Sequence, residues 1–308
     1  MFGFRAWLAL ATLIAIALGA TVDARAESST ASTSDGLAAS LARPWLALQQ
    51  PDGLFHDYMS GAADGVGRYG EAMLGLGLLR TGVRSSDQAS IDAGLRAVEA
   101  VLRDPGRQQR SPSAFEMFAM AAGYNLARTR LADDPRAIAL LPAWRERLAA
   151  ERPIQLRGGL GRVWNKSIVE AAGVLELLRS DVRSRVRGAW LADRRRARAR
   201  AARTLNRAIP RGSPRAHGRA MLGDWPSYPL AYHALSLGFY AHGVRLLGDA
   251  ATPQARRLLV EAARTSLVLT SPDGDLAYVG RSQEQSWALA FTAYGARAAA
   301  RYAHGRSV

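Results

Sequence analysis

Pro51-Asp52-Gly53-Leu54-Phe55-His56-Asp57-Tyr58, followed by Gly67-Arg68-Tyr69-Gly70-Glu71, is a pattern that returns near the other end of the chain. The second copy reads Pro272-Asp273-Gly274-Asp275-Leu276-Ala277-Tyr278, followed by Gly280-Arg281-Ser282-Gln283-Glu284. Each copy joins a Pro-Asp-Gly turn, an aromatic residue, Gly-Arg and an acid to a run of small residues typical of a helix. A turn-and-helix unit that recurs at both ends predicts an array of helical hairpins. Loops at one end of such hairpins can gather around a cleft, so these two loops are candidate functional segments.

The rest of the chain also predicts helices almost throughout. Ala, Leu and Arg dominate, and all three favour helices, whereas long runs of alternating β-branched residues are absent. The predicted helices, separated by Gly and Pro breakers, are 37–49, 69–81, 88–103, 112–131, 135–150, 165–179, 182–206, 228–247, 253–269 and 284–303. This pattern predicts an all-α fold, as a bundle, a solenoid or an (α/α) toroid, and the polar and aromatic loops favour a complete or incomplete toroid.

The N-terminal residues 1–26 have the pattern of a secretory signal peptide, with a basic start, a short apolar run and Ala24-Arg25-Ala26 at the cleavage position. We therefore expect a mature chain that begins at Glu27, with a flexible linker over 27–36 and a single helical domain over 37–308. The expected location is secreted or periplasmic, within the cell envelope, without stable membrane insertion after cleavage. The chain has no cysteine, so its stability must come from the core rather than from disulfides.

The formal net charge is +15, from 41 Lys and Arg residues against 26 Asp and Glu residues, and Lys166 is the sole lysine. The use of arginine in place of lysine fits a GC-rich genome. The excess of basic residues indicates an anionic partner such as nucleic acid, lipid head groups or acidic polysaccharide. Because the chain is expected to be exported, we expect an acidic polysaccharide and no nucleic acid.

Many of the arginines gather in one run between Arg183 and Arg219. At helical spacing, four of them form one stripe: Arg196, Arg200, Arg203 and Arg207. Such a run is either a solvated helix face or a surface that attracts an anionic chain.

The densest cluster of polar and aromatic residues is 223–233, which contains Trp225, Tyr228, Tyr232 and His233. Tyr228 and Tyr232 are four residues apart and share one helix face. A Tyr and a His near a helix start could act as proton donor and acceptor. The alternative is that the tyrosines pack between helices and His233 hydrogen-bonds a backbone carbonyl.

Two further clusters contain candidate ligand contacts. In the first, Trp164 could stack on a sugar while Asn165 and Lys166 contact a carboxylate; Asn165 is also a good helix N-cap residue. In the second, Arg281 could hold a carboxylate through two hydrogen bonds, with aromatic and polar neighbours such as Tyr278 and Gln283. The alternative for Arg281 is that it ties down its own loop.

Acidic residues in the two loops allow a different chemistry. Asp57 or Glu71 with Glu284 could form the carboxylate pair that glycoside hydrolysis requires. Asp52 and Asp273 precede glycine and are ordinary turn residues. The sequence shows no spacing of metal ligands and no phosphate-binding glycine loop, so we expect neither metal nor cofactor.

An exported helical chain with Trp164-Asn165-Lys166, Tyr232-His233 and Gly280-Arg281-Ser282 resembles the helical domain of (α/α)-toroid polysaccharide lyases of the alginate, heparinase and chondroitin lyase type. In that family an Asn, a His, a Tyr and often an Arg act on a uronate. Lys166 stands where the family has a second amide or His. The turn 50–53 also resembles turns of terpene-cyclase toroids.

The resemblance implies β-elimination on a uronate-containing polysaccharide. Asn165, with Arg281 or Lys166, would neutralise the substrate carboxylate, His233 or Tyr232 would accept the C5 proton, and a tyrosine would protonate the leaving oxygen. The expected substrate contacts are Trp164, Lys166, Trp225, Tyr228, Tyr278 and Gln283. The alternatives are a toroid glycoside hydrolase and a non-catalytic protein of the cell envelope that binds an anionic polymer.

Overall fold

The computed structural model describes residues 39–40, 42–55, 70–104, 114–150, 164–183, 193–223, 230–271 and 286–303. The fold is all-α, as predicted: helices dominate the described residues, and the paired strands there form a single short hairpin. The chain separates into two compact units. Unit 1 comprises residues 1–152 and 179–192, and unit 2 comprises residues 153–178 and 193–308. Closure of the helices into a toroid stays a prediction.

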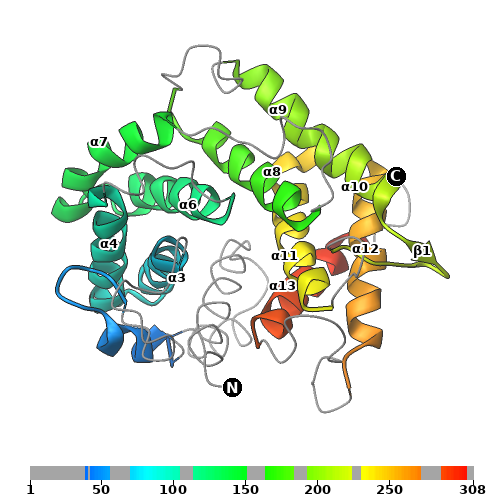
Figure 1. The fold of residues 1–308 in the computed structure, drawn as a ribbon, viewed down its shortest axis with the longest axis horizontal. Helices are drawn as coiled ribbons and strands as arrows, with labels where there is room; N and C mark the ends of the chain where they lie inside the picture. Colours follow the sequence, from blue (N-terminus) through cyan, green and yellow to red (C-terminus); the bar gives the residue numbers. More distant parts are fainter. Residues whose placement is uncertain are drawn as a thin grey trace. The chain divides into compact units, whose positions relative to one another are not determined.

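Unit 1 contains two helical hairpins after a first helical segment at 39–40 and 42–48. Their helices are α3 (Gly70–Ser85), α4 (Gln88–Arg103), α6 (Ala114–Arg130) and α7 (Pro135–Ala149). Helix α3 packs against α4 and α6, and α7 packs against α6 and α4 (Figure 1). Every residue from Gly70 to Gly82 is buried, so α3 is the central helix of this unit.

The hairpin of α3 and α4 is closely packed because small residues face each other. A Cβ on Gly94 would lie 2.9 Å from the carbonyl oxygen of Gly75, so the two backbones approach where neither residue has a side chain. Asp87 caps α4 by accepting a hydrogen bond from the backbone N–H of Ala89 at 3.2 Å. The predicted helix 88–103 is confirmed by the bounds of α4.

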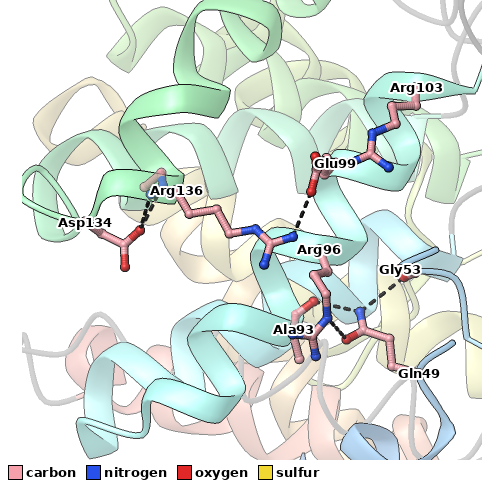
Figure 2. A network of polar contacts seen from close by, with 9 residues as sticks. Gln49, Gly53, Ala93, Arg96, Glu99, Arg103, Asp134 and Arg136 are labelled. Carbon is pink, nitrogen blue, oxygen red and sulfur yellow. Dashed lines mark hydrogen bonds and ion pairs between the residues drawn. The ribbon is translucent and has the colours of Figure 1, made fainter. Parts of the chain in front are cut away.

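Hydrogen bonds through Gln49 hold the first Pro-Asp-Gly turn, residues 51–53, against α4 (Figure 2). The Gln49 amide donates to the carbonyls of Gly53 (3.1 Å) and Ala93 (2.8 Å), and Arg96 Nε donates to Gln49 Oε1 at 3.0 Å. Asp52 accepts a hydrogen bond at 3.0 Å from the backbone N–H two residues later. These contacts agree with the interpretation of Asp52 as a turn residue. The second Pro-Asp-Gly turn lies outside the described residues.

Charged side chains join α4 to α7 next to this turn (Figure 2). Glu99 pairs with Arg136 at 2.8 Å and with Arg103 one helical turn away on α4. The hydrogen bond from Arg136 is the main reason that the pKa of Glu99 is lowered, and burial acts in the opposite direction. Asp134 caps α7 by accepting from the backbone N–H groups of Arg136 (3.0 Å) and Ala137 (2.9 Å).

Unit 2 contains most of the remaining elements. They are α8 (Trp164–Arg179), α9 (Arg194–Arg203), η2 (Thr204–Ala208), α10 (Ile209–Gly212), β1 (Arg215–Ala216), β2 (Arg219–Ala220), α11 (Leu230–Leu247), η3 (Gly248–Ala250), α12 (Pro253–Val268) and α13 (Ser286–Ala303). Helices α11, α12 and α13 pack against one another. Helices α11 and α13 approach closely at Gly238, where a Cβ would lie 2.1 Å from the Phe291 ring.

Helix α9, the π-helical turn η2 and α10 follow one another without a break and form one rod over residues 194–212 (Figure 1). The predicted helix 182–206 is therefore wrong at both ends. Val182 and Arg183 are not helical, and the helix begins after Asp193, whose side chain caps it by accepting from the N–H of Arg196 at 3.0 Å. At the other end Pro210 does not stop the helix, because it lies at the start of α10, directly after the π turn.

The segment after this rod folds into a β-hairpin that the sequence pattern did not predict. Strands β1 and β2 pair in antiparallel register, and His217 (φ 51°) and Gly218 (φ 71°) turn the chain between them. The backbone of β2 exchanges two hydrogen bonds with the Thr265 hydroxyl of α12, at 3.0 and 2.8 Å. The strands are short, so the hairpin depends on α12 for its position. Among the described residues, no helix has both the length and the apolar character needed to cross a membrane.

Candidate functional site

The predicted catalytic residue Asn165 lies in the first turn of α8, which begins one residue earlier at Trp164. Asn165 is 3% exposed, and its Oδ1 accepts a hydrogen bond from the backbone N–H of Lys166 at 2.6 Å. The Lys166 side chain is exposed. Asn165 and Lys166 are therefore neighbours in sequence whose side chains lie in different environments, one buried and one in solvent.

The predicted proton acceptor His233 is buried on α11, with 1% of its surface exposed. Its Nδ1 lies 2.8 Å from the backbone nitrogen and 3.0 Å from the carbonyl oxygen of Leu222, and its Nε2 lies 3.1 Å from the carbonyl oxygen of Ala262. A neutral ring that donates from Nε2 and accepts at Nδ1 satisfies both nitrogens. Burial lowers the pKa of His233 to about 4, although the two backbone contacts raise it in part. This geometry agrees with the alternative in which His233 bonds backbone groups.

Tyr232, the neighbour of His233, is half-buried. The other predicted site residues lie outside the described residues: Trp225, Tyr228, Tyr278, Arg281 and Gln283, together with the side chain of Trp164. For the hydrolase alternative, Glu71 is fully buried in α3 of unit 1, and Asp57 and Glu284 are outside the described residues. Convergence of these side chains on one cleft stays a prediction.

A small cavity lies beside the Leu222 backbone that holds His233. It is lined by residues of α8, α10 and the segment before α11: Ile168, Ile209, Gly212, Ser213, Met221, Leu222 and Gly223. Its volume of about 10 Å³ is close to the space that one water molecule needs. This cavity has no room for a sugar.

A buried polar group that the sequence pattern did not predict lies between α8 and α11. His242 Nε2 lies 2.7 Å from Glu176 Oε1, both side chains are at most 1% exposed, and Arg245 Nη2 lies 3.3 Å from His242 Nδ1. A guanidinium can only donate, so Nδ1 accepts and Nε2 carries the proton that is donated to Glu176. A histidine in the middle of an otherwise apolar helix was the available signal. The described residues contain no group of three His, Cys, Asp or Glu side chains able to hold a metal ion.

The rod over 194–212 separates apolar from basic side chains. Ala197, Ala201, Leu205 and Ile209 are buried by at least 99%. The exposed arginines of the rod, which we call the basic face, are Arg195, Arg196, Arg198, Arg203, Arg207 and Arg211. In the predicted stripe, Arg196, Arg203 and Arg207 are exposed as expected, whereas Arg200 is half-buried.

Little acidic charge balances this surface. Eight arginines and a single acid, Asp193, give residues 193–212 a net charge of +7, out of +15 for the whole chain. Asp193 pairs with Arg196 at 3.0 Å, with both side chains largely in solvent. For Arg195, Arg198 and Arg203, no side-chain hydrogen bond or ion pair is formed within the described part of the chain. The same is true of Arg207 and Arg211, so most of the basic face is available to an external anion.

No known family model matches this chain, and no curated protein matches it either.

Proposed function

We propose that this protein binds an acidic polysaccharide through the basic face of the rod over residues 194–212. Arginine suits this task because its planar guanidinium can bind a carboxylate through two parallel hydrogen bonds and keeps its charge at any physiological pH. A polysaccharide is favoured over nucleic acid because residues 1–26 have the pattern of a secretory signal, which indicates a secreted or periplasmic location.

The observation that carries the proposal is the concentration of exposed arginines on one rod, five of which form no side-chain hydrogen bond or ion pair within the described residues. Residues 193–212, with eight arginines and one acid, carry +7 of the net charge of +15, on a rod whose opposite side is packed in unit 2. An arginine-rich composition alone would distribute this charge over the whole surface. A dense row of like charges is unfavourable in the free protein, and a polyanion would relieve the repulsion.

Retention on immobilised alginate, a polymer of uronates, tests the proposal. We expect retention that decreases steeply with salt, because exposed charges are screened within about 8 Å at physiological ionic strength. The variant Arg195→Glu/Arg198→Glu/Arg203→Glu should elute at much lower salt. Its matched control is Arg43→Glu/Arg128→Glu/Arg130→Glu, which changes the net charge equally at exposed positions of unit 1. Equal elution of the two variants, or no retention of the wild type, would contradict the proposal.

β-Elimination on the same polymer is the catalytic form of this proposal. In this mechanism Asn165 and Arg281 would neutralise the substrate carboxylate, and Tyr232 or His233 would accept the C5 proton. His233 would have to give up a backbone partner to accept a proton, so Tyr232 is the better candidate of the two. Unsaturated products that absorb in the ultraviolet would support this chemistry, and new reducing ends without absorbance would support hydrolysis. If neither product forms, the protein binds the polymer without cleaving it.

A further inference from the structure

The π turn η2 changes the hydrogen bonding in the middle of the basic rod. The backbone N–H of Ile209 donates to the carbonyl of Thr204, five residues earlier, and so leaves the carbonyl of Leu205 without its α-helical donor. The hydroxyl of Tyr240 in α11 donates to this carbonyl at 2.9 Å. Burial raises the pKa of Tyr240, so the phenol keeps the proton that it donates. Tyr240 therefore satisfies the carbonyl that the π turn releases.

A second side chain in the π turn connects it to the start of α12. The Asn206 amide donates to the carbonyl of Ala250 at 2.9 Å and accepts from the backbone N–H of Thr252 at 3.0 Å. The irregular turn is thus held by α11 on one side and by the α12 cap on the other. Both contacts lie within unit 2.

The π turn sets which residues of α10 face outward. An α-helix rotates by about 100° per residue, and a π turn inserts about one residue into this register. With this insertion, four exposed arginines lie within about 80° of one another around the axis: Arg195, Arg203, Arg207 and Arg211. Ile209 then lies on the opposite side with Ala197 and Ala201, and all three are buried as this register requires.

Without the π turn the two ends of the rod would not share a basic face. In an uninterrupted α-helix, Ile209 would lie about 20° from Arg198, on the exposed side. Arg211 would lie about 40° from Ala197, on the buried side. The observed burial of Ile209, at 1% exposure, and the exposure of Arg211 both require the shifted register.

We infer that the π turn, held by Tyr240 and Asn206, aligns the arginines of α9 and α10 into one straight binding surface for an extended, linear acidic polysaccharide. The inference rests on the proposed function and specifies the shape of its ligand. From Arg195 to Arg211 the surface is about 24 Å long at 1.5 Å per residue, and neighbouring arginines lie about one or two turns apart. A flexible chain with an anionic group on each sugar can follow such a row, with its carboxylates facing successive guanidinium groups.

The first test uses alginate oligosaccharides of increasing length and the variant Arg207→Glu/Arg211→Glu. For the wild type, we expect affinity to increase with length until the ligand spans about 24 Å and then to level off. The variant should bind long oligosaccharides about tenfold more weakly, while short ones, which can bind α9 alone, should lose less. The control Arg128→Glu/Arg130→Glu carries the same charge change in unit 1. An equal loss for short and long ligands would overturn the inference.

The second test asks whether Tyr240 acts by setting the register. Tyr240→Phe removes the hydroxyl that donates to the Leu205 carbonyl and substitutes no arginine. If Tyr240 aligns α10, the substitution Arg207→Glu/Arg211→Glu should reduce affinity much less in the Tyr240→Phe protein than in the wild type. A double-mutant cycle measures this difference. Tyr124→Phe, which removes a hydroxyl that donates to Asp181 in unit 1 at 2.9 Å, is the control and should leave this cost unchanged.

The outcomes separate the inference from the proposed function. No binding of any alginate fragment by the wild type would contradict both. Binding that depends on Arg195, Arg198 and Arg203 but not on Arg207 and Arg211 would keep the proposed function and overturn the inference. Stronger binding of duplex DNA than of alginate of equal charge would identify nucleic acid as the ligand. It would contradict the acidic polysaccharide both in the proposed function and in the inference.

Discussion

The imidazole of His233 joins three parts of unit 2 that are far apart in sequence. Its partners, Leu222 and Ala262, precede and follow it by 11 and 29 residues. The sequence pattern identified His233 as a candidate site residue, with two interpretations: a proton acceptor, or a side chain that hydrogen-bonds a backbone carbonyl. It could not decide between them, because neither partner is marked by its residue type: any residue provides a backbone carbonyl.

This burial predicts a specific dependence of stability on pH. The folded-state pKa of His233, about 4, is below its ordinary value of 6.5, so the unfolded chain binds the proton more readily. The stabilisation from His233 is complete above pH 6.5 and is lost as the pH falls toward 4. In urea unfolding, the free-energy difference between wild type and His233→Gln should shrink over this range by up to about 3 kcal/mol. A difference that is constant with pH would contradict a buried, neutral His233.

Gly53 provides a second prediction about one residue. Its φ is +93°, and a Cβ there would lie 2.4 Å from the backbone oxygen of Arg96, which cannot move without α4. Gly53→Ala should therefore destabilise unit 1 by about 3 kcal/mol. Gly248→Ala is the control, because its φ of +56° is also positive but nothing lies within 4 Å, and it should cost only about 1 kcal/mol. Thermal unfolding measures both, and equal losses would mean that the turn relaxes away from α4.

The helices show which features of an element can be predicted from local sequence. The bounds of α4 match the prediction because Asp87 caps its start and the breakers Asp104, Pro105 and Gly106 follow its end. The rod over 194–212 was predicted to end at residue 206, because the π turn through which it continues depends on contacts of Tyr240 and Asn206 across the unit. A proline such as Pro210 predicts a break when only its neighbours in sequence are considered.

Asn206 allows a test of how the π turn supports the next helix. Asn206→Ala removes the hydrogen bonds to Ala250 and Thr252 and should destabilise the start of α12 by about 1–2 kcal/mol. Asn206→Asp keeps the oxygen that accepts from Thr252 but loses the donor to Ala250, so its effect should be intermediate. Hydrogen exchange of the first turn of α12 reports both. Unchanged exchange in Asn206→Ala would show that α12 is capped without the π turn.

At the scale of the whole molecule, the all-α fold and its helical hairpins follow from composition and from the repeated turn-and-helix pattern. Within each unit, consecutive helices pack as predicted, for example α3 with α4 and α12 with α13. The candidate site was less predictable. The predicted catalytic site required side chains from distant loops to converge, which local patterns cannot establish. Charge counts and helical spacing predicted the basic run and three exposed arginines of its stripe, but the alignment of Arg211 with them depends on the π turn.

The central claim is that a polyanion occupies the basic face, and arginine-specific chemical footprinting tests it directly. The protein is modified with phenylglyoxal with and without alginate, and each arginine is followed by mass spectrometry. We expect strong protection of Arg195, Arg198, Arg203, Arg207 and Arg211, which are exposed on the rod. Arg128 and Arg130, exposed in unit 1, should react equally in both samples. Uniform protection of all exposed arginines, or protection elsewhere but not between 195 and 211, would contradict the account.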